Sequence, residues 1–75
     1  MTFWQWVVDW MKNRPCERLG QAFVNDFVKE PFPELYYTED NNHAWRLIEG
    51  WLLRYDYNDM NMPQKIERGE YNGYL

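Results

Sequence analysis

The density of aromatic side chains is the feature that most limits how this chain can fold. Five Trp, six Tyr and four Phe occur within 75 residues. A chain of this length buries only about 60–65% of the surface that it exposes when unfolded, so large side chains have to build its core. Aromatic residues bury roughly 150–250 Å² each, and this chain has more of them than a three-helix core needs. We therefore expect some to remain on the surface, where Tyr and Trp are over-represented at binding hot spots.

Apolar residues at helical spacing predict three helices, over residues 3–12, 15–29 and 40–55. The prolines in Pro31-Phe32-Pro33 end the second helix, because each restricts its own φ and disfavours helical geometry in the preceding residue. A short extended or single-turn connector follows. Gly20 costs about 1 kcal/mol relative to Ala inside a helix, so its presence predicts the close approach of another helix.

The expected architecture is an all-α, compact three-helix domain with a Pro-bounded extended connector and a polar C-terminal tail. The domain covers residues 1–62, and residues 63–75 form a loosely ordered or docked tail in which Pro63 can open one further helical turn. The predicted core-facing positions are Phe3, Trp6, Val7, Trp10, Leu19, Phe23, Phe27, Ala44, Ile48, Trp51, Leu52 and Tyr55.

The first predicted helix carries more apolar residues than one neighbouring helix can cover. Beside its core face, Trp4, Val8 and Met11 form a second row. Helices that lie on membranes usually carry Lys and Arg on their polar face, whereas this helix has Gln5 and Asp9 there. Core or dimer packing is therefore favoured, and the row of Trp4, Val8 and Met11 is the predicted surface for homodimer formation.

The charge of the chain argues against direct binding of nucleic acid. The net charge is −4, and the eight basic residues are scattered along the sequence. Proteins that bind nucleic acid non-specifically use clustered Lys and Arg to displace counterions from phosphates. An acidic surface instead suits a basic protein partner, such as the groove of a nucleic-acid enzyme. A plainer interpretation is that the charge keeps a small domain soluble.

Acidic and aromatic side chains alternate on two short segments that flank the third predicted helix. In such a surface, tyrosines would anchor a partner and carboxylates would steer it. The predicted partner-binding residues are Glu34, Tyr36, Tyr37, Glu39, Asp40, Asp56, Tyr57 and Asp59.

The sequence offers weak candidates for four kinds of catalytic or metal site, and none of them is favoured. One Cys and one His cannot form a structural zinc site, and a nucleophilic pair of Cys16 and His43 lacks an evident orienting group. An EF-hand loop beginning at Asp56 would place Glu67 at its twelfth position, but its sixth is Asn61, where the turn needs glycine. Paired carboxylates could serve glycoside hydrolysis, which needs a sugar-sized cleft. We expect no enzyme activity, metal or cofactor.

The cysteine count and the hydropathy pattern predict a cytoplasmic protein. Cys16 is the only cysteine, so no internal disulfide can form and a reducing compartment fits. A signal-peptide pattern is not present at the N-terminus, and no stretch approaches the roughly 18 apolar residues of a membrane span.

Residues 18–27 read Arg-Leu-Gly-Gln-Ala-Phe-Val-Asn-Asp-Phe, and Pro-Glu-Leu-Tyr-Tyr follows at 33–37, then Asp40. This stretch resembles a loose group of small uncharacterised proteins of tailed bacteriophages and prophages, in which a Gly-Gln-Ala-Phe helix precedes a Glu-Leu-Phe-Tyr segment. The resemblance covers about residues 18–52, and Tyr36 stands where Phe is expected. The group brings no assigned activity, so no residue role is carried over.

The resemblance implies a context rather than a site. Short acidic phage proteins often bind and block a host enzyme or a defence complex, including CRISPR effectors. The expected function is therefore a phage-type inhibitor of a bacterial host protein or nucleoprotein complex. The alternative is a structural or assembly module that dimerises through its Trp-rich first helix.

Overall fold

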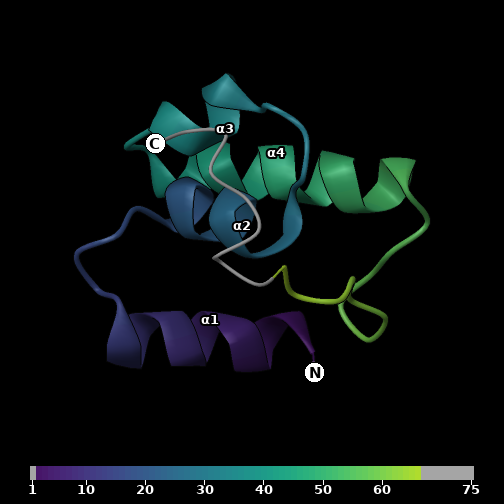
Figure 1. The fold of residues 1–75 in the computed structure, drawn as a ribbon, viewed down its shortest axis with the longest axis horizontal. Helices are drawn as coiled ribbons and strands as arrows, with labels where there is room; N and C mark the ends of the chain where they lie inside the picture. Colours follow the sequence, from purple (N-terminus) through teal and green to yellow (C-terminus); the bar gives the residue numbers. More distant parts are fainter. Residues whose placement is uncertain (1, 67–75) are drawn as a thin grey trace.

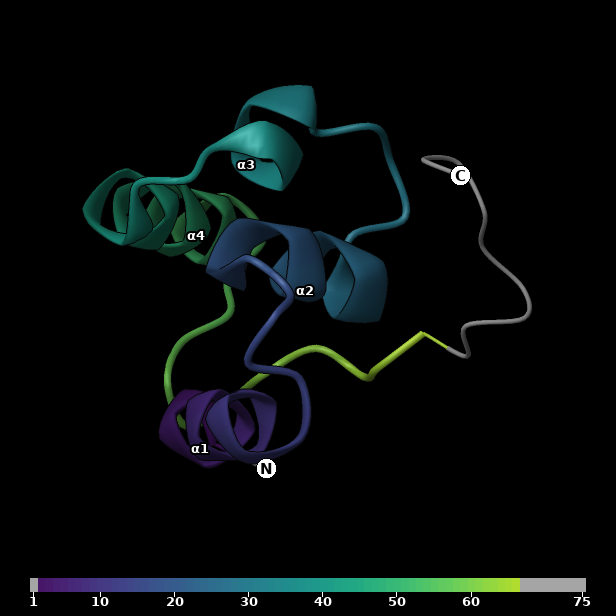
Figure 2. The same cartoon turned by 90° about the vertical axis from the view of Figure 1, so that its left-hand side faces the viewer.

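Four helices form the part of the chain that the computed structural model describes, residues 2–66. They are α1 (Phe3–Asn13), α2 (Leu19–Phe27), α3 (Pro33–Tyr37) and α4 (Asn41–Arg54). In both Figure 1 and Figure 2, α2 and α4 form a middle layer, with α3 on one side of it and α1 on the other. The predicted all-α class is confirmed, and a fourth, short helix is added to the three expected. No helix within residues 2–66 is long and apolar enough to cross a membrane.

The second helix is shorter than the sequence pattern predicts, because a turn replaces its first residues. α2 begins at Leu19, and the Gln21 side chain accepts a hydrogen bond from the Arg18 backbone N–H at 3.3 Å. The chain before it turns through residues 14–17, where Glu17 N–H donates to the Arg14 carbonyl and Trp10 Nε1 donates to the Glu17 carbonyl. The turn brings α1 back against α2.

The expected extended connector contains α3, because Pro33 stands at its first position, where a missing N–H costs nothing. The expected helical turn at residues 63–66 is not formed. There the Ile66 N–H donates instead to the carbonyl of Asp26 at 2.7 Å, which draws this segment along α2. Most of the tail predicted at 63–75 lies outside the described residues.

Aromatic side chains dominate the core. Trp6 is fully buried and meets Phe23 and Phe27 edge-on, with ring centroids 5.6 and 5.5 Å apart. Such edge-to-face pairs add about 0.5–1.5 kcal/mol each beyond the area that they bury. The prediction that Tyr55 belongs to the core is wrong, because its side chain is 44% exposed at the end of α4. The buried apolar residues are Phe3, Trp6, Leu19, Ala22, Phe23, Val24, Phe27, Val28, Leu35, Tyr36, Ala44, Ile48 and Leu52.

Gly20 allows α2 and α3 to touch, which confirms the predicted close approach. A Cβ at this position would lie 2.8 Å from Leu35 Cδ1 and 3.0 Å from the Leu35 carbonyl carbon, and closer still to the carbonyl oxygen. Leu35 is fully buried, so the contact is part of the core. α3 is thereby fixed on α2.

A buried carboxylate joins α1, α2 and the chain after α4. Asp26 is 1% exposed and accepts hydrogen bonds from Trp6 Nε1 at 2.7 Å and from both terminal nitrogens of Arg14 at 3.0 and 2.6 Å. Lys65 Nζ lies 3.7 Å from the same carboxylate. Burial alone would lower the pKa of Arg14, but its hydrogen bonds to Asp26 and the nearby carboxylates raise it. The guanidinium therefore remains charged beside Asp26.

Candidate protein-binding surfaces

The predicted partner-binding residues fall into two groups at opposite ends of α4. Fourteen residues of helix separate the groups, which corresponds to about 21 Å. One group surrounds the junction between α3 and α4, and the other lies in the loop after α4. The structure therefore does not bring the eight residues together into one surface. We call Glu34, Tyr37, Glu39 and Asp40 the α3–α4 corner.

The assignment of Tyr36 to an exposed surface is wrong, because its side chain is buried. The Arg18 guanidinium lies over the Tyr36 ring, 5.8 Å from its centroid, and donates to the Tyr36 carbonyl through Nη2 and Nε at 3.0 and 3.3 Å. Tyr36 thus supports the corner from inside. Neighbouring tyrosines in a short helix project in different directions, and the sequence pattern alone did not show which of them faces α2.

The corner exposes an aromatic ring among carboxylates. Tyr37 is 61% exposed, and its ring packs edge-on against that of Tyr36, with ring centroids 4.8 Å apart. Glu34, Glu39 and Asp40 are also exposed. His43 Nε2 lies 3.0 Å from Glu34 Oε2, so the first turn of α4 and the short α3 are linked at the surface. An exposed anchor is therefore held between two connected helices.

Asp40 caps α4 and also contributes an exposed carboxylate to the corner. Substitutions that keep or remove the cap separate the two roles. The Asp40 carboxylate caps α4 by accepting from the backbone N–H groups of Asn42 and His43 at 2.9 and 3.4 Å. Asp40→Ala should lower the free energy of unfolding by about 1 kcal/mol, because the cap is lost. Asp40→Asn should change it by only a few tenths, because Asn caps as well as Asp. Urea denaturation measures both, and equal losses for the two variants would contradict a capping role.

The second group of predicted residues belongs mainly to the framework. Asp56 has a positive φ of 63° in the loop that follows α4. Tyr57 is half-buried and stacks on Trp51, with ring centroids 6.0 Å apart and planes at 16°. Asp59 is exposed, and its carbonyl accepts from the Phe3 N–H at 2.9 Å. The loop therefore ties the end of α4 to the beginning of α1.

The geometry of this loop differs from that of an ion-binding loop. The side chain of Asn58 accepts from the backbone N–H groups of Met60 and Asn61, both at 2.9 Å, and closes a tight turn. Glu67, the twelfth position of the weighed EF-hand pattern, lies outside the described residues. Within residues 2–66, no three His, Cys, Asp or Glu side chains gather closely enough to hold a metal ion. The candidate nucleophilic pair was Cys16 and His43. Cys16 is exposed, and the His43 ring interacts with the Glu34 carboxylate rather than with Cys16.

The residues predicted for self-association lie in line on the outside of α1. The exposed fractions are 55% for Trp4, 53% for Val8 and 60% for Met11. We call these three residues the α1 face. The Trp4 ring packs against Trp45 of α4, with ring centroids 5.2 Å apart. Trp45 also meets the Phe3 ring edge-on, with centroids 5.0 Å apart. The contact between Trp45 and Trp4 joins distant parts of the chain and had no signal in the sequence.

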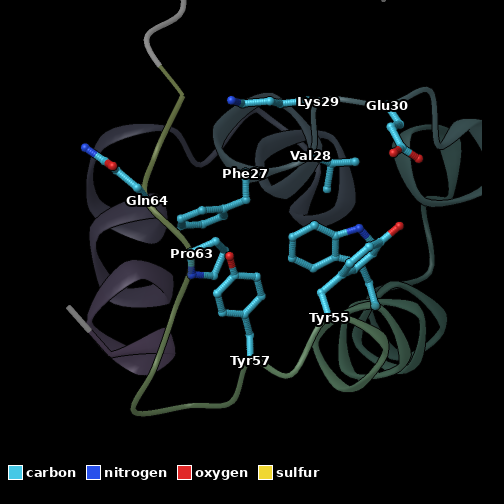
Figure 3. Close-up of a pocket in the computed structure, with 9 residues that line it drawn as sticks. Phe27, Val28, Lys29, Glu30, Tyr55, Tyr57, Pro63 and Gln64 are labelled. Carbon is cyan, nitrogen blue, oxygen red and sulfur yellow. The ribbon is translucent and has the colours of Figure 1, made fainter.

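An aromatic groove opens between the ends of α2 and α4 and the chain that follows them (Figure 3). It has a volume of about 420 Å³, and Lys29 and Glu30 stand at its rim, as Figure 3 shows. The sequence assigned Trp51 and Tyr55 to the core and so missed this groove. Its apolar lining comprises Phe27, Val28, Trp51, Tyr55, Tyr57 and Pro63.

Comparison with known proteins gives no relative from which a function can be transferred. No protein-family model matches the chain, and neither a curated protein nor a solved structure is significantly similar to it.

Proposed function

We propose that this protein binds and inhibits a bacterial protein through the α3–α4 corner. The observation that carries the proposal is the 61% exposure of Tyr37 between carboxylates that are themselves exposed. Tyrosine is enriched at interface hot spots because its ring offers a large contact area and its hydroxyl a hydrogen bond. Acidic groups around such an anchor speed association with a basic surface and fix its orientation.

The rigidity of the corner supports this proposal. The backbone beneath Tyr37 is held by the Arg18 hydrogen bonds to the Tyr36 carbonyl, and Leu35 is packed against Gly20. A contact surface that is already ordered loses less conformational entropy on binding than a flexible one. The corner therefore has the properties of a preorganised docking site.

The class of partner follows from charge and from the phage-like sequence pattern. Three carboxylates within one small surface favour a basic protein groove, such as that of a nucleic-acid-handling or defence complex. Arg46 adds a basic charge to the second turn of α4, the helix that begins at the corner. We therefore favour a mechanism in which Tyr37 docks on the partner and the carboxylates steer association, over one in which the protein mimics a nucleic acid.

Tyr37→Ala is expected to weaken partner binding by about 30-fold or more, as for a hot-spot aromatic. Tyr55→Ala is the matched control, because Tyr55 is also an exposed tyrosine but lies at the opposite end of α4. Each tagged variant is used to capture proteins from bacterial lysate, and the retained partner is then titrated against the purified variants by calorimetry. Equal affinities for Tyr37→Ala and the unmodified protein would contradict the proposal.

Charge reversal tests the steering part separately. Glu39→Lys should slow association by several-fold and reduce its dependence on salt, because it changes a charge beside the anchor. Asp9→Lys makes the same change of net charge on α1, on the other side of the middle layer, and should have little effect. Stopped-flow association rates measured at low and high salt distinguish the two. Identical behaviour would show that only net charge matters.

A second function, as an assembly module, is favoured by the α1 face. Three large apolar side chains, each more than half exposed, lie along one side of an eleven-residue helix. Exposed apolar surfaces of this kind mark protein–protein contacts when their members are contiguous. Figure 2 shows α3 and α1 on opposite sides of the middle layer, so one protein can use both the corner and the α1 face.

A further inference from the structure

We infer that the α1 face binds the α1 face of a second copy of this chain, with the two helices antiparallel and crossing near Val8. This inference rests on the assembly function and names its partner. It draws on three observations: the order of the side chains along α1, the support of Trp4 by α4, and the charges at the two ends of the helix.

The order of the side chains makes the α1 face complementary to itself. Val8 is the central residue of α1 (Phe3–Asn13), with Trp4 one turn before it and Met11 nearly one turn after it. In an antiparallel pair with two-fold symmetry, each contact occurs twice, except for contacts of a residue with itself on the axis. Val8 then meets Val8 of the second copy, and each Trp4 meets Met11 of the second copy. A thioether against the edge of an aromatic ring is a favourable contact.

The bulkiest member of the face is already held in place. The Trp4 ring packs against Trp45, with ring centroids 5.2 Å apart, and meets the Phe3 ring edge-on, with centroids 6.1 Å apart. More than half of its surface nevertheless remains exposed. A side chain that is fixed before association loses little rotamer entropy in the interface. Trp4 is therefore suited to anchor a dimer.

Opposite charges stand at the two ends of α1. Lys12 is exposed in the last turn. At the first turn, the hydrogen bond from Phe3 N–H to the Asp59 carbonyl places the exposed Asp59 beside the helix N-terminus. Glu49 and Asp59 line the same small groove, so this end carries two carboxylates. Antiparallel pairing brings Lys12 towards Asp59 of the second copy, whereas parallel pairing would bring the two lysines together.

The size of the surface sets the expected strength. Stable interfaces commonly bury about 800 Å² on each partner, and the total accessible surface here is 5217 Å². The α1 face has three exposed apolar side chains, whereas each partner contributes about 20–30 residues to a standard interface. We therefore expect a dimer with a dissociation constant in the micromolar range.

Sedimentation equilibrium of the full chain, at concentrations from about 5 to 500 µM, tests the inference, with a reversible monomer–dimer equilibrium as the expected result. Val8→Asp should weaken self-association by about 30-fold or more, because a charge would be buried at the two-fold axis. Tyr55→Asp is the matched control, because Tyr55 is exposed at the end of α4 and lies outside both the α1 face and the α3–α4 corner, and it should leave self-association unchanged. Circular dichroism confirms that both variants fold. A monomer at all concentrations, or a dimer indifferent to Val8→Asp, would overturn the inference.

A charge exchange tests the antiparallel geometry. Lys12→Glu should weaken the dimer by about two- to 30-fold, the range of two exposed ion pairs, because two-fold symmetry repeats the Lys12–Asp59 pair at each end of the interface. The double variant Lys12→Glu/Asp59→Lys should recover the loss, since each copy again presents opposite charges at the two ends of α1. Equal self-association of the single and double variants would overturn the antiparallel arrangement.

Failure of the inference can be told apart from failure of the assembly function. If the chain is monomeric but Val8→Asp still abolishes capture of another protein from lysate, the α1 face serves a different partner. If Val8→Asp changes neither self-association nor capture, the assembly function fails as well.

Discussion

Asp26→Ala is expected to lower the free energy of unfolding by about 3–5 kcal/mol, the cost of removing one partner from a buried ion pair. The substitution leaves the Arg14 guanidinium without its bidentate acceptor and the Trp6 indole N–H without its hydrogen bond. A domain of this size has a total stability of about 4–11 kcal/mol. The variant should therefore lose about half of its stability or unfold at moderate temperature. Urea denaturation followed by circular dichroism gives the difference.

Two further variants show whether the loss comes from burial. Glu17 also contacts Arg14, at 3.4 Å, but its side chain is more exposed than that of Asp26. Glu17→Gln should therefore cost no more than about 1 kcal/mol. Asp26→Asn keeps the size of the side chain and one acceptor oxygen. Its loss of stability should lie between those of Glu17→Gln and Asp26→Ala. A loss below about 1 kcal/mol for Asp26→Ala would mean that the buried ion pair adds little to the other contacts that hold α1.

Gly20→Ala is expected to destabilise the protein by about 1–3 kcal/mol, towards the upper end of the usual cost of overpacking. The added methyl group would meet the backbone carbonyl of Leu35 as well as its side chain, so relief requires a movement of α3. Because α3 carries Tyr37, the substitution should also weaken binding at the α3–α4 corner. Unfolding in urea and partner titration measure the two effects.

Gly50→Ala is a control for which the expected change in stability has the opposite sign. Gly50 is exposed in α4, and nothing lies within 4 Å of the position that its Cβ would occupy. Alanine there should raise stability by about 0.5–1 kcal/mol, because glycine is the poorer helix former. If both glycine substitutions changed stability in the same direction, close packing at Gly20 would not be the reason for its presence.

The helices and much of the core could be predicted from local spacing. Thr2 and Gln5, three residues apart, form a capping box at the start of α1, with hydrogen bonds of 3.1 and 2.7 Å. Phe23, Phe27, Ile48 and other residues at helical spacing are buried as expected. The row of Trp4, Val8 and Met11 also follows from helical periodicity, and its exposure agrees with the prediction that the helix has more apolar surface than its neighbours cover. Its use in self-association remains a proposal.

The candidate surfaces depend on contacts between distant residues, which spacing does not encode. Tyr36 and Tyr37 look equivalent in sequence, but the position of α3 on α2 buries one ring and exposes the other. The two acidic segments flank α4, and its fourteen residues keep them at opposite ends of the helix. Trp51 and Tyr55 have core spacing, yet they line a groove because the chain that returns along α2 leaves a gap beside them.

By itself the sequence determined the helical class, the capped first helix and the apolar rows, because these follow from interactions between residues three or four apart. Only the tertiary structure decided which polar group is buried and which aromatic ring is free. Asp26 looks like an ordinary surface carboxylate in its helix, and it is buried because Trp6, Arg14 and Lys65 approach it from other parts of the chain. A buried charge is tolerated where such partners converge, and their convergence is a property of the folded chain.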